Sequence, residues 1–349
     1  MTLSLDSYRL LGRSGLRVSP LALGTMTFGE SWGADEAESH RMFDAYVDRG
    51  GNFIDTAGFY ALGRSEELTG KFAQGKRSRL VISTKYSLAV GTGDPNAAGN
   101  GRKSMLRSVE ESLKRLATDY IDLLFLHVWD ETTPVDEILR GFDDLVRQGK
   151  VLYIGISDTP AWQIARLQAV AELRGWTQFA ALQLEYNLLQ RSAERELIPM
   201  ARALGIGVMP WSPLASGLLS GKYVVAAQAN AEPAGGRGAM LTAHGMVNER
   251  TIAVASSVKR VADELHVTSS QAALAWTLVN PAVAAPMVGA RTLRQLEDNL
   301  GALEVEFAQA QLAELAAASR FELGFPHDFL QMDFIRAALT GGTKLRPRN

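Results

Sequence analysis

Eight short apolar runs recur along the chain, each followed by a longer amphipathic stretch, and this alternation limits the folds open to it. Most of the runs are continuously apolar, which is typical of strands buried on both faces of a parallel sheet. The runs are residues 19–24, 52–56, 79–85, 120–127, 151–157, 179–185, 205–210 and 284–289. Eight strand–helix units in 349 residues favour an α/β fold, the (β/α)8 TIM barrel. An open doubly wound sheet is the alternative, because length and alternation alone do not show that a sheet closes.

The amphipathic stretches carry the start and stop signals of helices. Residues 35–50 open on an aspartate, have acidic residues in the first turn and end at a glycine. Residues 133–150 begin with threonine and proline, which suits a first turn, and residues 292–303 start with a threonine cap. Ahead of the first strand, residues 8–18 are predicted to form a hairpin that plugs the barrel floor. No linker divides the chain, so we expect a single domain over residues 1–349.

The composition excludes several classes of function. A net charge of −2 gives no basic footprint for nucleic acid and no charge block suited to a membrane surface. Cysteine is absent, which rules out disulfides, cysteine nucleophiles and thiolate metal sites. The five histidines are scattered without a metal-binding pair, and no apolar run reaches the roughly 18 residues that span a bilayer. With no signal-peptide layout at the N-terminus, the sequence predicts a cytoplasmic protein without a metal site.

Four polar residues stand at or just after the ends of three consecutive predicted strands. Asp55 ends the second strand, and Tyr60 follows in its loop. Lys85 ends the third strand and His127 ends the fourth. Adjacent strands lie about 4.8 Å apart, so these side chains can meet at the carboxyl end of a barrel, where such enzymes place their catalytic groups.

The four residues suit proton transfer to a carbonyl oxygen. A free tyrosine, with a pKa of about 10, is a poor acid at neutral pH, but a lysine about 4 Å away could lower that pKa by up to about three units. Asp55 can supply the counter-charge that a buried Lys85 needs. His127 would orient an oxygen bound at the hydroxyl of Tyr60. Taken singly, each residue also has a structural interpretation, as a cap, a snorkelling cation, a core histidine or a packed ring.

These residues lie in segments that closely resemble the aldo-keto reductases, in particular their aryl-alcohol dehydrogenase-like and potassium-channel β-subunit-like branch. The segment DTAGFYALGRSEELTG resembles the family's Asp…Tyr signature, and STK, DLLFLH and GKVLYIGIS follow in the family's order. The resemblance runs from LGRSGLRVSPLALGTMTFG to GARTLRQLEDNL, which is most of the chain. It implies an NADP(H)-dependent (β/α)8 enzyme in which Tyr60 is the general acid, Lys85 and Asp55 tune it, and His127 positions the carbonyl.

The resemblance also implies where the cofactor NADP(H) is held. Ser157, Asp158 and Gln183 fall where the family contacts the nicotinamide carboxamide, and Trp211 falls where an aromatic residue stacks on the ring. The pyrophosphate positions are Ser212, Leu214, Ser216, Gly217, Leu219 and Lys222. The positions at the adenosine end and its 2′-phosphate are Gly289, Arg291, Gln295, Asp298 and Asn299. A helix that opens just after the last strand suits a phosphate there.

Two positions depart from the family's pattern. Many members carry Asn where Asp158 stands, and a carboxylate can accept from the amide NH2 of the cofactor but cannot donate to its oxygen. Many members place an arginine where this chain has Gln295, and Arg291 could compensate through bidentate contact. The expected cofactor is therefore NADP(H), with NAD(H) left open.

An apolar substrate pocket is predicted near the barrel mouth. Its candidate residues are Phe28, Trp32, Phe59, Tyr86 and Trp129, whose alternative role is packing. They favour an aromatic or hydrophobic carbonyl compound as the small-molecule substrate. A long loop over about residues 211–250 is expected to cover the cofactor, and opening of its stretch 223–249 to limit turnover. The tail over about residues 320–349 could cap the pocket or contact another subunit, so the oligomeric state stays open.

Two other functions are weighed against the reductase. A nucleotide-binding regulatory module, as in relatives associated with potassium channels, would keep the fold and the nucleotide but turn over little substrate. A metal-dependent barrel hydrolase is disfavoured, because only one of the five histidines ends a predicted strand. Turnover of a carbonyl compound with NADPH would separate the enzyme from the binding module.

Overall fold

Eight strands form one parallel sheet, in the order β10–β3–β4–β5–β6–β7–β8–β9. The computed structural model describes residues 3–91, 93–224, 242 and 244–344. The strand bounds are β3 Ala22–Gly24, β4 Phe53–Asp55, β5 Val81–Tyr86, β6 Ile121–Leu126, β7 Val151–Ser157, β8 Phe179–Glu185, β9 Gly207–Trp211 and β10 Met287–Val288. Each of the eight predicted apolar runs overlaps one of these strands.

The sheet closes on itself between its two outer strands. The amide of Val208 in β9 donates to the carbonyl of Ala282 (3.0 Å), and the amide of Ala284 donates to the carbonyl of Val208 (2.8 Å). This bridge lies in the segment that leads into β10, and β10 itself pairs with β3. The ring of parallel pairing is thereby completed. The predicted (β/α)8 barrel is confirmed, and the open doubly wound sheet does not apply.

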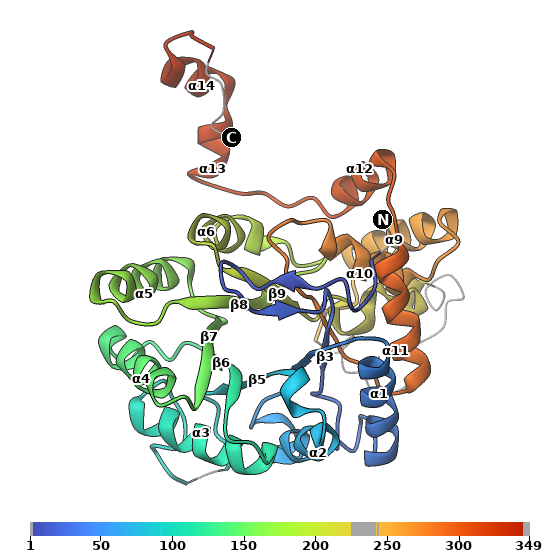
Figure 1. The fold of residues 1–349 in the computed structure, drawn as a ribbon. Helices are drawn as coiled ribbons and strands as arrows, with labels where there is room; N and C mark the ends of the chain where they lie inside the picture. The colour runs from blue at the N-terminus through green and yellow to red at the C-terminus, as the bar shows by residue number, and fades with distance from the viewer. Residues whose placement is uncertain (1–2, 92, 225–241, 243, 345–349) are drawn as a thin grey trace.

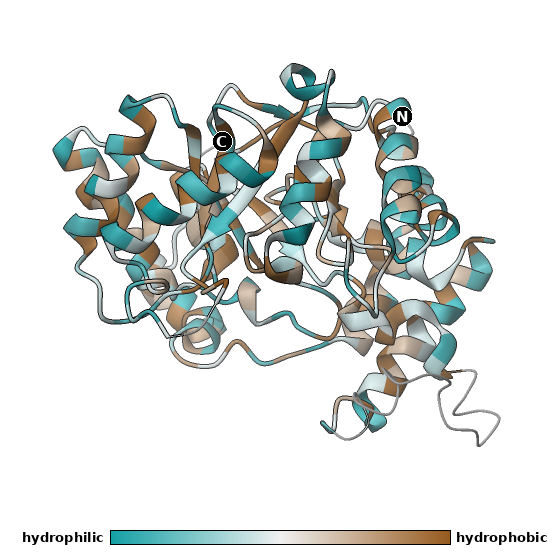
Figure 2. Cartoon of the chain, turned by 90° about the horizontal axis from the view of Figure 1, so that it is seen from below, coloured by the Kyte–Doolittle hydropathy of each residue, from teal (hydrophilic) through white to brown (hydrophobic). Residues whose placement is uncertain are grey.

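Helices lie around the outside of the barrel (Figure 1). Their bounds are α1 Glu36–Asp48, α2 Arg64–Ala73, α3 Arg102–Leu116, α4 Val135–Arg147, α5 Ala161–Arg174, α6 Leu197–Leu204, α9 Glu249–Glu264, α10 Ser269–Leu278, α11 Leu293–Leu300 and α12 Gln309–Ala318. Asp35 and Thr292 cap α1 and α11 with their side chains, as predicted. Along the helices in Figure 2, brown apolar residues alternate with teal ones, as expected where one helix face covers a sheet. None of the helices in the described ranges is long and apolar enough to cross a membrane.

Two separate apolar layers follow from the alternation of side chains along each strand. The larger layer lies between the strands and the surrounding helices. The smaller one fills the barrel interior, and its buried members are Leu11, Val18, Ala22, Phe53, Val81, Leu123, Phe125, Ala181, Met209, Ala284, Ala285 and Met287. Leu11 and Val18 come from the N-terminal hairpin of β1 (Arg9–Leu10) and β2 (Arg17–Val18). The hairpin therefore plugs the barrel floor, as the sequence predicts.

The C-terminal segment leaves the body of the barrel. After α12 the chain runs out to α13 (His327–Gln331) and α14 (Asp333–Thr340), which project from the rest of the molecule in Figure 1. At its base, Arg195 donates to the carbonyls of Glu322 and Leu323, and His327 contacts Glu196 at 2.9 Å. These contacts attach the start of the segment to the region just before α6.

Gly155 in β7 tests how tightly the barrel interior is filled. A Cβ atom at this position would lie 2.3 Å from the ring of Phe125 in the neighbouring strand β6. We expect Gly155→Ala to lower the free energy of unfolding by about 1–3 kcal/mol in urea denaturation, as overpacking of a filled core does. Gly15→Ala is the control: nothing lies within 4 Å of the added atom, and we expect a change below about 0.5 kcal/mol. Equal stability of Gly155→Ala and the parent protein would contradict this packing.

Candidate active site

Three strand ends bring a carboxylate, an ammonium and an imidazole to one end of the barrel. Asp55 is the last residue of β4, Lys85 lies near the end of β5, and His127 follows β6 directly. Each faces the barrel interior, because it lies an even number of positions from an interior apolar residue of its own strand, namely Phe53, Val81 or Phe125. The clustering predicted from the strand ends is present in the structure.

The ammonium of Lys85 is the centre of this cluster. Its Nζ lies 2.6 Å from Oδ2 of Asp55, and both side chains are buried. The same nitrogen donates to the carbonyl oxygen of Thr56 at 2.8 Å and lies 3.0 Å from the hydroxyl oxygen of Tyr60. The cation therefore has a counter-charge and two further oxygen partners, which a buried charge needs.

The other carboxylate oxygen of Asp55 accepts two hydrogen bonds. Ser83 Oγ donates to Oδ1 at 2.7 Å, and Gln183 Nε2 donates to the same atom at 3.0 Å. Ser83 is not among the residues predicted from the sequence, although it lies two positions before Lys85 and so on the same face of β5. Gln183 is predicted to contact the nicotinamide carboxamide, whereas in this structure its amide nitrogen donates to Asp55.

A strained turn presents the hydroxyl of Tyr60. Residues 61–63 all have left-handed φ angles of 47°, 52° and 94°, a conformation that costs a non-glycine residue about 1–2 kcal/mol. Arg115 packs against this turn, because a Cβ atom on Gly63 would lie 2.7 Å from its Cδ. Glu66 pairs with Arg115 at 2.6 Å and is itself buried. A partly buried ion pair thus supports the turn.

Burial decides which groups of the cluster carry charge. Burial raises the pKa of Tyr60, and this outweighs the nearby Lys85 ammonium, which lowers it. Lys85 therefore lowers the pKa of Tyr60, as the sequence predicts, but the cost of desolvating a phenolate here is larger, and the net direction is upward. Burial alone would lower the pKa of Lys85, but the charge of Asp55 raises it above its usual value. Tyr60 keeps its proton and Lys85 stays a cation.

His127 completes the cluster as a neutral imidazole. Burial, with a smaller contribution from Lys85, lowers its pKa to about 3. Its ring stands edge-on to that of Tyr60, with 6.1 Å between the ring centroids. Among the described residues, no hydrogen bond holds its ring nitrogens. One of them is therefore available to donate to an oxygen placed beside Tyr60. In the same described part of the chain, no group of three or more His, Asp or Glu side chains could hold a metal ion.

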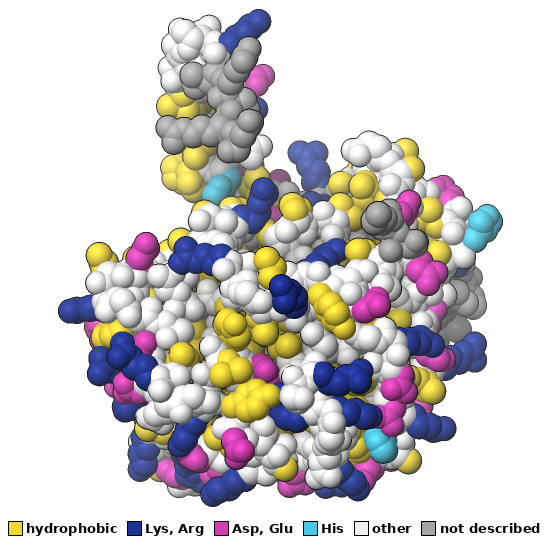
Figure 3. All heavy atoms as spheres, viewed as in Figure 1, with side chains coloured by type: hydrophobic (Ala, Val, Ile, Leu, Met, Phe, Trp, Pro, Cys, Tyr) yellow, Lys and Arg dark blue, Asp and Glu magenta, His cyan; other side chains and the backbone are white. Residues whose placement is uncertain are grey.

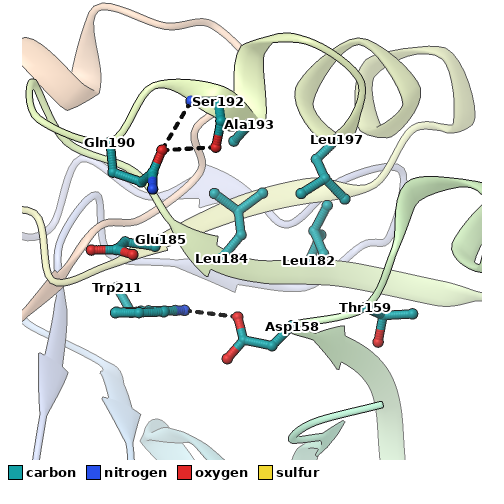
Figure 4. Close-up of a pocket in the computed structure, with 10 residues that line it drawn as sticks. All are labelled: Asp158, Thr159, Leu182, Leu184, Glu185, Gln190, Ser192, Ala193, Leu197 and Trp211. Atoms are coloured by element: carbon teal, nitrogen blue, oxygen red, sulfur yellow. Dashed lines mark hydrogen bonds between the residues drawn. The ribbon is translucent and has the colours of Figure 1, made fainter. Parts of the chain in front are cut away.

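The residues predicted at the nicotinamide end line the same mouth. Ser157 ends β7 two positions after the inward-facing Gly155; it is 1% exposed, and its hydroxyl has no hydrogen-bond partner among the residues that the structure describes. Trp211 ends β9 and donates from Nε1 to Oδ1 of Asp158 at 3.1 Å (Figure 4). Asp158 and Trp211 border a cavity of about 230 Å³ together with Glu185, whose pKa is raised by burial. The orphaned hydroxyl of Ser157 is the feature that points to a ligand, because a buried polar group without a partner costs about 1–3 kcal/mol.

The residues predicted at the pyrophosphate form a compact turn after β9. The 3-10 helix η4 (Ala215–Ser220) contains left-handed backbone at Ser216 and Gly217. The amide of Ser216 donates to Ser212 Oγ at 3.0 Å, and the amide of the buried Leu219 donates to the carbonyl of Leu214. The Nζ of Lys222 would lie 3.5 Å from a Cβ atom on Gly217, so this cation lies over the turn. Residues 225–241 and 243 of the predicted covering loop lie outside the described residues.

The residues predicted at the adenosine end divide into two groups. Arg291 is exposed ahead of α11, and its amide donates to Oε1 of Gln295 at 3.0 Å. Gly289 directly follows β10 at the mouth. Asp298 is directed toward α10 instead, where it accepts from the Thr268 hydroxyl at 3.1 Å, and its neighbour Asn299 is buried. The structure therefore leaves Arg291 as an exposed cation at this end and gives Asp298 a contact between helices.

Three of the five predicted pocket aromatics have accessible surface. Trp32 is 40% exposed and Phe59 is 48% exposed, and Phe59 directly precedes Tyr60. Trp129 is partly buried and follows His127 by two positions. Phe59 and Trp129 thus stand within two positions of Tyr60 and His127 in the chain.

The other two aromatics are a correction to the predicted pocket. Phe28 is buried, and the centroid of its ring lies 6.4 Å from the ring centroid of Phe72 in α2. Tyr86 is buried, with its ring 5.6 Å from that of Phe142 in α4. Because Tyr86 follows Lys85 directly in β5, the two side chains point to opposite faces of the sheet. Both aromatics pack between the barrel wall and the helices, outside the mouth.

Comparisons with known proteins agree with this arrangement. The profile of the Aldo/keto reductase family matches residues 20–320. The chain is 36% identical over 339 residues to norsolorinic acid reductase from Aspergillus flavus, covering 93% of this chain and 84% of the relative. It is 36% identical over 338 residues to an aryl-alcohol dehydrogenase from Pestalotiopsis microspora, covering 93% and 85%. It is also 36% identical over 333 residues to the aryl-alcohol dehydrogenase (NADP(+)) of Phanerodontia chrysosporium, covering 90% and 86%. The chain is therefore an oxidoreductase that belongs to the aldo/keto reductase family.

Proposed function

We propose that this aldo/keto reductase uses NADP(H) to reduce aldehydes or ketones to alcohols, with Tyr60 as the general acid. The observation that carries the proposal is the contact of 3.0 Å between Lys85 Nζ and the Tyr60 hydroxyl, made by a lysine that is already paired with Asp55. A protonated tyrosine beside a fixed cation can give its proton to a carbonyl oxygen and remain as a phenolate. The alternative to this proposal is the same reaction with NAD(H) as the cofactor.

Several residues fit the cofactor that the family implies. The buried hydroxyl of Ser157 lacks a partner and would hydrogen-bond the carboxamide. Trp211, at the mouth end of β9, would stack on the ring, and the exposed Arg291 would pair with the 2′-phosphate. The relative from Phanerodontia chrysosporium carries NADP(+) in its name, which supports the choice of dinucleotide. When bound, the reduced nicotinamide supplies the hydride to the carbonyl carbon.

The residues of the chain supply the proton and stabilise the charge that its transfer leaves. Tyr60 keeps its proton in the resting site, because burial raises its pKa. As the proton moves to the carbonyl oxygen, the Lys85 ammonium attracts the developing phenolate by about 4 kcal/mol at an effective dielectric near 20. His127, neutral because its pKa is lowered to about 3, would donate a second hydrogen bond to the same oxygen.

The mouth and the relatives support an aromatic or hydrophobic carbonyl substrate. Phe59 exposes an apolar ring directly before Tyr60, and Trp32 exposes a second flat apolar ring. The relatives at 36% identity are named norsolorinic acid reductase and aryl-alcohol dehydrogenase. These names also favour turnover over a regulatory module that only binds the nucleotide.

Tyr60→Phe removes the transferable proton and keeps the ring. We expect turnover of 4-nitrobenzaldehyde with NADPH, followed at 340 nm, to fall by about 10²- to 10⁴-fold, the usual contribution of a general acid. NADPH affinity in a fluorescence titration should stay unchanged. Tyr86→Phe is the matched control, because that ring lies outside the barrel wall, and it should change turnover by less than about twofold. Full turnover in Tyr60→Phe would remove this residue from the acid role.

The protonation states of His127 and Tyr60 predict a flat pH profile. With a pKa of about 3 for His127 and a raised pKa for Tyr60, neither group changes charge between about pH 5 and 9. We expect kcat/KM for carbonyl reduction, measured by rapid assay at saturating NADPH, to vary by less than about twofold over this range. A limb centred near pH 6.5 that disappears in His127→Gln would show a histidine that charges in the folded protein, which contradicts the assignment.

Ser157→Ala separates stability from cofactor binding. Removing a buried hydroxyl that has no partner should raise the free energy of unfolding of the cofactor-free protein by about 1 kcal/mol, whereas NADPH binding should weaken by about three- to tenfold through the lost hydrogen bond. Urea denaturation and a fluorescence titration measure the two effects. Ser104→Ala in α3 is the control, since it removes another unpartnered buried hydroxyl and should leave NADPH affinity unchanged. Unaltered NADPH affinity in Ser157→Ala would refute the carboxamide contact.

A further inference from the structure

A second cavity lies at the floor of the barrel, at the opposite end from Tyr60. It has a volume of about 510 Å³ and lies between the N-terminal hairpin, the end of α6 and the start of β9. Arg9, Arg13 and Arg202 line it together with aliphatic and glycine residues, and no acidic residue lines it. We propose that this cavity binds a small polyanion, a compound with at least two phosphate or carboxylate groups a few ångström apart.

Arg9 differs from the other partly buried arginines of the described residues. These are Arg77, Arg102, Arg115 and Arg191, and each of them forms an ion pair with a carboxylate. Within the part of the chain that the structure describes, the only partner of the Arg9 side chain is the carbonyl oxygen of Val283, 3.3 Å from Nη1. Burial lowers the pKa of Arg9, and no neighbouring carboxylate offsets it. A partly desolvated cation without a counter-charge is unfavourable, and an anion in the cavity would relieve that cost.

Two more arginines reach the same cavity from different elements. Arg13 follows the first hairpin strand, and its stem packs over Gly205, where a Cβ atom would lie 2.9 Å from its Cδ. The amide of Arg13 donates to the carbonyl of Gly205 at 2.8 Å, which fixes the hairpin against the start of β9. Arg202 projects from the last turn of α6 and is exposed. Neither side chain forms an ion pair within the described residues. Figure 3 views the face over the hairpin and shows dark blue side chains set among yellow ones.

The charge balance of the cavity favours a ligand with more than one negative group. The C-terminus of α6 ends there, and its dipole places about half a negative charge against an anion. Three guanidinium groups exceed that charge several times over. A guanidinium group can bind two oxygens of one phosphate or carboxylate group at the same time. A diphosphate or a tricarboxylate could therefore bind two or three of these arginines at once. The volume also falls within the range of about 300–1,000 Å³ that is typical of small-molecule sites.

Isothermal titration calorimetry of the full chain with sodium pyrophosphate tests the proposal. A second titration uses citrate as the ligand. We expect saturable binding at low ionic strength that weakens as NaCl is added. Arg9→Gln and Arg202→Gln should each weaken it by about tenfold, the effect of one charge-assisted contact. Arg17→Gln is the matched control, because this exposed arginine of β2 lies outside the cavity. The affinity of this variant for pyrophosphate should match that of the parent protein. Tighter binding of pyrophosphate than of citrate assigns the site to phosphate compounds, and the reverse assigns it to carboxylates.

Measuring the NADPH affinity of the same variants shows whether the anion site is independent of the cofactor site at the barrel mouth. We expect it to be unchanged in Arg9→Gln and Arg202→Gln, and this control does not depend on any turnover. Arg202→Gln changes only an exposed side chain, so the test holds even if Arg9→Gln folds poorly. Absence of pyrophosphate and citrate binding would overturn the proposal. Equal pyrophosphate affinity in all three variants, or a parallel loss of NADPH affinity, would overturn it as well.

Discussion

The chemistry proposed for this barrel depends on the buried ion pair between Lys85 and Asp55. Moving two charges into a protein interior is costly, and such a pair adds little stability even when its geometry is good. Here the cost is offset because the carboxylate also accepts from Ser83 and Gln183, and the ammonium also donates to the Thr56 carbonyl. These hydrogen bonds hold the ammonium group of Lys85 in a single position. Its remaining partner is the hydroxyl of Tyr60, so in the proposed reaction the ion pair would provide geometry rather than stability.

The two neighbours of this ion pair are tuned in opposite directions by the same burial. Desolvation disfavours charge on any group, so it raises the pKa of Tyr60 and lowers that of His127. Both effects leave a neutral hydrogen-bond donor facing the place where a carbonyl oxygen would lie. The Lys85 charge adds to the effect on His127 and opposes it on Tyr60. A tyrosine that keeps its proton until an acceptor arrives is better suited to be an acid than one that has already lost it.

The sequence predicts the barrel and the four central residues because both depend on periodicity. Eight apolar runs define the strands, and a side chain at the end of an inward-facing row must point into the mouth. The same rule excludes Tyr86 from the mouth, because it follows Lys85 by one residue and therefore faces α4. A pocket predicted from aromatic residue type alone does not distinguish the two faces of a strand. Ser83 was accessible to the same reasoning. The raised pKa of Tyr60 and the support of its turn by Arg115 were not, because they depend on burial and on contacts between residues far apart in the chain.

The apolar side chains that fill the barrel interior separate the mouth of the barrel from its floor. Phe125 and Met209 lie in the interior layer, and Gly155 has no side chain because the ring of Phe125 takes that space. Charged groups at the mouth and at the floor are therefore insulated from each other by apolar side chains. At the mouth both charges of the central cluster have a partner within the chain, whereas at the floor the described residues offer Arg9 only a carbonyl oxygen. A site that pairs its own charges can hold a precise geometry for chemistry, and one that leaves a cation unpaired has free energy available for binding an anion.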